Sequence, residues 1–532
     1  MKYYLISIGG TGAKCLEAFV HMNAAGLMRD SGEINIIYVD PDASNGNLAK
    51  AKNTVRSYIQ AYNGMSQDSF FFKNPLKQAE KTWNPVPNTA QANLKTIFER
   101  SNMDVKAENL HSLFDVLFSE EEQNTLLTEG FRAHPSIGAA VIGANMNMDE
   151  QDSVWKNMVT DIGEQEARIF FFGSVFGGTG AAGFPNIAKI IRNYFNDRAN
   201  NPERIKMAGC LMLPYFQFPP ASEEDMKDPN DPDKKIIVPD SGKFLASTYA
   251  ALNYYDTNNL VGNVFDAIYL VGDRQFVNIS EFKAGQAEQR NKANYVEMIA
   301  ALSALEFFNK ESNDSYFRNP DCYMLAMHNR KFSWQDLPPV YPGCTMENKL
   351  KSFIRMVYMY RSYVFPKMQE CRNDERQYRT NVWIEGYLYQ MIERIIIGPK
   401  REGFIDDTND RIGQDFHKYC VTFLDWLKDL TYSSEAAENN NLRCAGLVNN
   451  NIHKYDDTST FEENCNDLTG GRAVVKAQDI FPEDSSVFDD GRNSFVEKMI
   501  DEAKHNDEVT NVGMKALLAM VYDVSKDGRT VE

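Results

Sequence analysis

The hydrophobic pattern at the start of the chain changes from strand-like to helical and back. Residues 2 to 8 and 34 to 39 (INIIYV) form short apolar blocks, and residues 15 to 28 carry apolar side chains at helical spacing. A strand, a glycine turn, a helix and a second buried strand in this order predict the beginning of a parallel α/β sheet.

The same order of elements returns later in the chain. Three further apolar blocks, ARIFFFGSVF, IKMAGCLMLPYFQF and VFDAIYLVGD, predict strands, and helical patterns lie between them up to about residue 310. The stretch PSIGAAVIGANMN (135–147), which precedes these blocks, is interpreted as a glycine-punctuated loop. We therefore expect a parallel-sheet domain over residues 1–310 with a helical insertion at about 45–131, a helical second domain over 311–432, and a polar linker with a C-terminal helical tail over 433–532.

Composition narrows the class of protein. Of the 532 residues, 43% are hydrophobic, which is enough for folded cores, and the formal net charge of −18 argues against a general nucleic-acid binder. No apolar run approaches the roughly 18 to 20 residues of a membrane span, and the eight cysteines show no metal-binding spacing. We expect a cytoplasmic protein with reduced thiols.

The tetrapeptide Gly-Gly-Thr-Gly occurs twice, at residues 9–12 and 177–180, each time between an expected strand and an expected helix. Glycine lets backbone N–H groups approach an anion, and a helix N-terminus attracts negative charge, so both loops are candidate phosphate sites. Neither carries the lysine of a P-loop. The first loop also lacks the third glycine of the dinucleotide fingerprint, although Asp40 stands where that fold places its ribose-binding acid. An NAD(P)-dependent oxidoreductase is therefore an alternative.

Four phrases follow one another along the chain: IGGTGAKC (8–15), VDPDA (39–43), IGANM (142–146) and FGGTGAAGFP (176–185). In type and order they resemble the nucleotide loops of the tubulin/FtsZ superfamily of GTP-binding proteins, with IGANM similar to the γ-phosphate loop. Within that superfamily, HPSIGAA (134–140) and FSWQDLP (332–338) most resemble the divergent bacterial tubulin-like proteins. The phrases LPYFQF (213–218) and KANYVEMIAALSAL (292–305) resemble the turn near the ribose and the central helix of the family.

The resemblance implies a Rossmann-like parallel-sheet domain that binds GTP or GDP with Mg²⁺ and self-associates into filaments or oligomers. It places Tyr215 near the ribose and Asn294 on the guanine edge, with Tyr295 or Arg290 stacking on the base. The nucleotide-binding residues that it implies are Gly9, Gly10, Thr11, Gly12, Asp40, Asp42, Gly143, Ala144, Asn145, Gly177, Gly178, Thr179, Gly180, Tyr215 and Asn294.

Some positions depart from the family pattern and leave alternatives open. Phe176 and Ala182 stand where the family has glycines, and no Asn-x-Asp-type catalytic loop follows the central helix, where Asp336 and Glu347 are the nearest acids. The sequence therefore leaves open a nucleotide-gated scaffold that does not hydrolyse GTP. Plain structural roles are equally open: Asx turns at the two aspartates of the second loop, a turn at Asn145, and a helix N-cap at Asn294. The C-terminal region is a possible surface for a protein partner.

Overall fold

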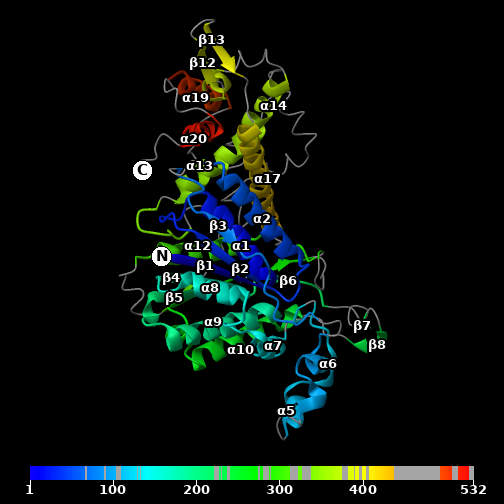
Figure 1. Ribbon diagram of the computed structural model, residues 1–532. Coiled ribbons are helices and arrows are strands. Elements are labelled where there is room, and N and C mark those ends of the chain that lie inside the picture. The colour runs from blue at the N-terminus through cyan, green and yellow to red at the C-terminus, as the bar shows by residue number, and fades with distance from the viewer. Residues whose placement is uncertain are drawn as a thin grey trace.

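The computed structural model is an α/β protein whose central sheet carries helices on both faces (Figure 1). It describes residues 1–65, 69–88, 92–103, 109–128, 130–131, 134–220, 227–228, 231–235, 240–273, 276–279, 287, 289–311, 321–325, 337–344, 346–373, 382–388, 390–394, 398–402, 407–435, 492–505 and 513–526.

Seven parallel strands of the described chain form the central sheet, in the order β11-β9-β5-β4-β1-β2-β3. Their bounds are β1 Lys2–Ile8, β2 Ile34–Val39, β3 Leu76–Gln78, β4 Ala167–Ser174, β5 Ile205–Met212, β9 Ala267–Val271 and β11 Asp321–Leu325. Every residue of β4 is buried, as expected of a central strand covered on both faces.

Successive side chains of β1 point to opposite helical layers. Tyr3 packs edge-on against Phe308 of α12 (Tyr295–Asn309), whereas Tyr4 donates its hydroxyl to Asp161 of α8 (Val154–Ile162). The layer of α12 also holds α1 (Gly9–Ala24) and α2 (Gly46–Tyr62); the layer of α8 holds α7 (Pro135–Asn145), α9 (Gly178–Arg198) and α10 (Phe244–Thr257) (Figure 1).

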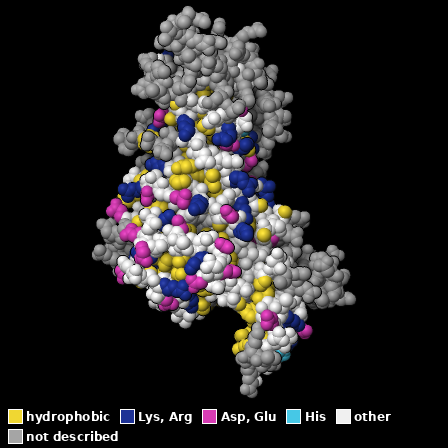
Figure 2. Space-filling model, in the orientation of Figure 1, with side chains coloured by type: hydrophobic (Ala, Val, Ile, Leu, Met, Phe, Trp, Pro, Cys, Tyr) yellow, Lys and Arg dark blue, Asp and Glu magenta, His cyan; other side chains and the backbone are white. Residues whose placement is uncertain are grey.

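A small helical arm projects from the lower layer in Figure 1. It contains α3 (Leu94–Ile97), a 3-10 turn over Arg100–Asn102, α5 (Leu110–Leu117) and α6 (Glu120–Asn124). Phe114 and Phe118 pack together inside the arm, while Leu113, Val116 and Leu117 are exposed on the other face of α5, where Figure 2 shows hydrophobic surface.

A second group of helices packs above α1 and α2 (Figure 1). It comprises α13 (Met346–Met359), a π-helical turn (Tyr360–Val364), α14 (Phe365–Asn373), α16 (Val382–Leu388), α17 (Asp407–Glu435), α19 (Arg492–His505), α20 (Met514–Ser525) and the antiparallel hairpin β12–β13 (Gln390–Arg394 and Gly398–Glu402). The buried His21 of α1 bonds the Tyr419 hydroxyl of α17 over 3.0 Å, which joins the two groups.

The remaining described elements are short. They are β6 (Phe216–Gln217), which pairs with β10 (Val277–Asn278), the antiparallel β7 (Lys227–Asp228) and β8 (Asp231–Lys235), α11 (Leu260–Asn263), and 3-10 turns over Pro202–Arg204 and Ser241–Lys243.

The α/β architecture expected from the sequence is confirmed, with differences at the expected boundaries. The stretch assigned to a helical insertion at 45–131 begins with α2, which packs on α1, and includes β3, which pairs with β2. The sheet also extends beyond residue 310, because β11 pairs with β9. Both β3 and β11 are strands because they pair with strands distant in the sequence, and hydrophobic periodicity does not predict such pairing.

Two local expectations were wrong. The helix expected over residues 15 to 28 begins at Gly9, so the first glycine turn is itself helical. The stretch PSIGAAVIGAN, interpreted as a glycine-punctuated loop, is the helix α7, which begins with a proline at its first position. Its small residues serve helix packing: a side-chain carbon on Gly138 would lie 2.5 Å from Cβ of Ala182 in α9.

The C-terminal tail expected over 433–532 is described at α19 and α20, and the polar tract at 436–491 lies outside the described residues. Leu517, Leu518 and Val521 of α20 are fully buried, and α20 packs on α13, α16 and α17. Among the described residues, no helix combines the length and the apolar content needed to cross a bilayer.

Candidate functional site

The strand order places both glycine motifs at one point of the sheet. The chain passes from β1 outward through β2 to β3, and then returns to β4 on the other side of β1. At such a reversal the helices that follow the two central strands leave on opposite faces, and a crevice opens outside the carboxyl ends of the strands. The first Gly-Gly-Thr-Gly segment directly follows β1, and the second follows β4 after Val175 and Phe176.

Both segments form the first turns of helices whose N-termini have no side-chain cap. Helix α1 begins at Gly9, which has φ +70°, and α9 begins at Gly178; neither preceding residue, Ile8 or Gly177, accepts a capping hydrogen bond. No side-chain cap therefore satisfies the first N–H groups of either helix, and such N-termini are suited to an anion. The loops also touch, because a side-chain carbon on Gly9 would lie 3.3 Å from Cβ of Thr179.

Within each Gly-Gly-Thr-Gly motif, the last glycine is tightly packed and the threonine is partly exposed. A side-chain carbon on Gly12 would lie 2.7 Å from the carbonyl oxygen of Phe172, and one on Gly180 would lie 2.6 Å from the backbone nitrogen of Ser174, so the last glycine of each motif is required by close backbone approach. Thr11 and Thr179 are half-buried, and among the described residues neither hydroxyl has a hydrogen-bond partner. The threonines are therefore the side chains that the two loops offer to a ligand.

The loop after β2 supplies buried carboxylates. One oxygen of Asp40 accepts a bond from the Asp42 N–H at 3.0 Å, and the other is buried without a hydrogen-bond partner among the described residues. Burial raises the pKa of Asp40 to about 7. Asp42 accepts bonds from the backbone and hydroxyl of Ser44, so the Asx-turn alternative describes both aspartates.

Two buried asparagines beside the first glycine loop were missed by the sequence reasoning. Asn45 caps α2 by accepting bonds from two N–H groups, and its amide donates to Gln289. Asn47 accepts a bond from the N–H of Asn291 at 2.9 Å, while its amide nitrogen lies 3.4 Å from the side-chain position of Gly10. The Asn-Gly-Asn sequence after Asp42 was the available signal, and only the contact with Gly10 shows its relevance.

The residues expected to form the γ-phosphate loop end a helix instead. Gly143 and Ala144 are exposed near the C-terminus of α7. The side-chain amide of Asn145 donates to the carbonyl of Pro85 at 3.0 Å, and the amide of the adjacent Asn84 donates to Pro41. Asn145 therefore bonds the backbone of the Asn84–Pro85 segment, and that segment in turn bonds Pro41 in the loop after β2.

Tyr215 and Asn294, expected at the ribose and the base, are both buried and engaged. The Tyr215 hydroxyl donates to Oε1 of Glu297 at 2.6 Å, and burial raises the pKa of Tyr215 well above its ordinary value. Asn294 is the N-cap of α12 in a capping box with Glu297, which is the structural role left open by the sequence. Tyr295 is buried with its hydroxyl bonded to Asp273, and Arg290 is exposed.

Phe176 and Ala182, the departures from the family pattern, have packing roles. The ring of Phe176 lies among Tyr215, Phe216 and Phe244, with the Phe244 ring centroid 4.8 Å away. This cluster holds the residue that directly precedes the second glycine motif. Ala182 is buried where α9 meets α7, a contact that needs a small residue.

Neither metal ligands nor a catalytic acid stand out in the part of the chain that the structure describes. No group of three or more His, Cys, Asp or Glu side chains there could hold a metal ion. Of the acids considered for hydrolysis, Glu347 pairs with Lys351 on the same helix, and Asp336 lies outside the described residues.

No protein-family model matches this chain, and no curated protein is detectably similar to it.

Proposed function

We propose that this chain binds a guanine nucleotide, GTP or GDP, with its phosphates at the uncapped N-termini of α1 and α9. The carrying observation is the meeting of two Gly-Gly-Thr-Gly turns at the strand reversal between β1 and β4, where Gly9 contacts Thr179. Two helix N-termini aimed at one crevice can stabilise phosphate charge without a lysine. The guanine preference rests on the resemblance to the tubulin/FtsZ superfamily.

The residues around the two turns fit a nucleotide phosphate and a magnesium ion. The Thr11 and Thr179 hydroxyls and the Asn47 amide can donate to phosphate oxygens. Mg²⁺ is usually held by one or two carboxylates together with substrate phosphates and water, and Asp40, with a buried oxygen that no described residue bonds, is suited to that role. The ion would supply positive charge next to the phosphates.

Self-association into filaments or oligomers belongs to the same proposal. A polymerising GTPase would show a rate of GTP hydrolysis per molecule that rises with protein concentration, because a neighbour completes the site. A nucleotide-gated scaffold would bind GTP and leave it intact. Turnover measured across protein concentrations, together with light scattering after GTP addition, separates the two.

A dinucleotide-dependent oxidoreductase is the second candidate. The strand order is that of a doubly wound dinucleotide-binding sheet, and Asp40 directly follows β2, at the position of the ribose-binding acid. Such a protein would bind NAD(P) and show no preference for guanine.

The test is to identify the nucleotide that the purified protein releases on denaturation, and to compare GTP binding in Gly10→Glu. Gly10 is half-exposed, and the atoms nearest to its side-chain position belong to the amides of Asn45 and Asn47, so we expect the new carboxylate to enter the crevice and repel phosphate. The matched control is Asn200→Glu, an equal charge change at an exposed residue after α9, at the amino edge of the sheet. Release of a dinucleotide, or equal binding in both variants, would refute the proposal.

A further inference from the structure

Glu297 is the fully buried centre of a polar cluster at the start of α12. One of its oxygens accepts the Tyr215 hydroxyl at 2.6 Å, and the other accepts the N–H of Asn294 at 2.9 Å. A single carboxylate therefore holds together the two segments that the resemblance assigns to the ribose and the base.

The same carboxylate forms an ion pair with Lys14 of α1. Lys14 is buried as well, and its ammonium lies 5.8 Å from the centroid of the Tyr215 ring. Lys14 lies two residues after the Gly-Gly-Thr-Gly turn, on the helix whose N-terminus faces the crevice. The ion pair thus joins the phosphate end of the candidate site to its nucleoside end.

Isolated buried charges are strongly unfavourable, so a pair of this kind is maintained only where geometry and further hydrogen bonds compensate the lost hydration. Here all the compensating groups come from segments around the crevice, namely α1, the turn after β5, and the start of α12. Asp429 of α17 supports the same segment from the other side, with its carboxylate 3.4 Å from the N–H of Ala293 and 2.8 Å from Lys50.

We infer that the Lys14–Glu297 pair is a positioning device that sets the spacing between the phosphate-binding turn of α1 and the nucleoside-binding segments at Tyr215 and Asn294. This inference rests on the proposed nucleotide binding and adds residues that the sequence comparison did not single out. The pair acts through other residues. Its loss should therefore weaken the simultaneous binding of the phosphates and the nucleoside of one nucleotide, while the phosphate-binding turn still binds phosphate.

The experiment measures the affinities of GTP and of inorganic tripolyphosphate for wild-type protein and for Lys14→Met. In this variant Glu297 keeps its bonds to Tyr215 and Asn294 but loses its link to α1. We expect tripolyphosphate affinity to remain within about twofold, while GTP affinity falls about tenfold, so that the advantage of GTP over tripolyphosphate is largely lost. A purely structural role would lower both affinities together or neither.

The double variant Lys14→Met/Glu297→Gln keeps the readout available if the single variant does not fold, because it removes the link and restores charge neutrality. The matched control is Asp266→Asn, which breaks a partly buried pair with Arg192, 2.8 Å apart at the amino edge of the sheet, and should lower thermal stability without changing the ratio. An unchanged ratio in the folded Lys14 variants would overturn the inference. A wild-type protein that binds neither probe would overturn the proposed function and this inference with it.

Discussion

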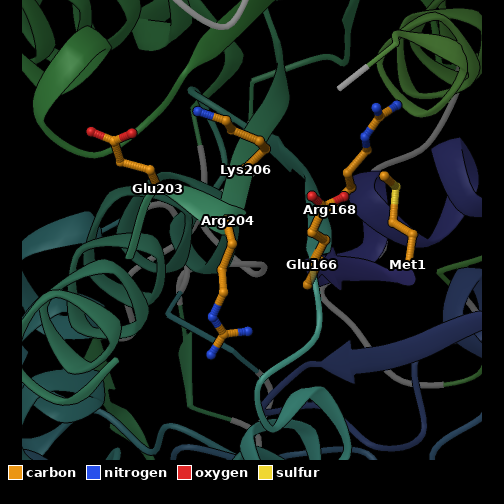
Figure 3. Close-up of a pocket in the computed structure, with 7 residues that line it drawn as sticks. Met1, Glu166, Arg168, Glu203, Arg204 and Lys206 are labelled. Atoms are coloured by element: carbon orange, nitrogen blue, oxygen red, sulfur yellow. The ribbon is translucent and has the colours of Figure 1, made fainter. Parts of the chain in front are cut away.

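At the amino edge of the sheet lies a hollow (Figure 3), lined by Met1, Glu166, Ala167, Arg168, Glu203, Arg204 and Lys206. At the carboxyl edge, the glycine turns of α1 and α9 surround the crevice between β1 and β4. Both regions are polar, and charged side chains predominate in the lining of the amino-edge hollow.

The two edges differ in what their polar groups already bind. Arg168, one of the residues that line the hollow in Figure 3, donates to the carbonyls of Phe307 and Phe308 at the end of α12. Arg204 donates to two carbonyls, with only Nε lacking a partner among the described residues, and Lys206 pairs with Asp266. Charge at the amino edge therefore serves the fold.

The carboxyl edge holds polar groups that the described fold leaves without partners. They include the helix N-termini without side-chain caps, the hydroxyls of Thr11 and Thr179, and one oxygen of Asp40. Buried polar groups normally have hydrogen-bond partners, so polar groups without such partners indicate a ligand site better than a concave or charged surface does. The predictions below test this contrast, from the largest expected effect to the smallest.

Gly12→Val should cause the largest loss of stability, about 3 kcal/mol, because its new side chain would overlap the backbone carbonyl of Phe172 at 2.7 Å. Gly143→Ala is the control, since no other described atom lies within 4 Å of its side-chain position, and it should stay within about 0.5 kcal/mol of wild type. Urea denaturation measures both. Equal stabilities would show that the glycine turns are not constrained by packing.

Asp40→Asn should stabilise the unliganded protein by about 2 kcal/mol at pH 8, because it replaces a buried carboxylate that lacks full hydrogen bonding. The folded pKa of about 7 lies above the reference value of 3.8, so the folded state retains a proton that the unfolded state releases, and stability contributed by this group falls as pH rises from about 4 to 7. Asp42 and Lys52 are the charged groups that act on it.

Denaturation across pH 4 to 8 checks this prediction, and the variant should show a flatter profile. At the amino edge, Asp161→Asn should have the opposite sign, because hydrogen bonds from Lys2 and Tyr4 outweigh partial burial and lower the pKa of Asp161. Its contribution is present near neutral pH and is lost as pH falls. Destabilisation by Asp40→Asn at pH 8 would contradict the idea of an unmet carboxylate.

Thr11→Val and Thr179→Val should each weaken nucleotide binding about fivefold, equivalent to about 1 kcal/mol for one hydrogen bond to phosphate, with little change in thermal stability. Isothermal titration and a melting curve measure the two quantities separately. A loss of stability without a loss of affinity would place the hydroxyls in the fold and not in the site.

Lys206→Met should have the smallest effect, within about 1 kcal/mol in stability, since its pair with Asp266 spans 3.7 Å at a partly exposed edge. Nucleotide affinity should not change. A marked loss of nucleotide affinity in this variant would indicate that the nucleotide binds at the hollow in Figure 3 and not at the glycine turns.

The sequence by itself determined the parallel α/β architecture, because the apolar blocks that became β1, β2, β4, β5 and β9 are long enough to be recognised without tertiary information. It also identified the paired glycine turns, whose residue types are dictated by local backbone geometry and close approach. The short strand β3 and the strand β11 were missed, since each is established by pairing with a distant neighbour.

Only the tertiary structure decided which predicted residues meet. It brought Gly9 to Thr179 and Gly10 to Asn47, and it engaged Tyr215 and Asn294 with Glu297. It also made the end of IGAN the C-terminus of α7. Hydrogen-bond partners and helix packing depend on segments far apart in the chain, and local periodicity carries no information about them. The same reason explains why Lys14 and Glu297, ordinary in the sequence, form a buried pair at the centre of the candidate site.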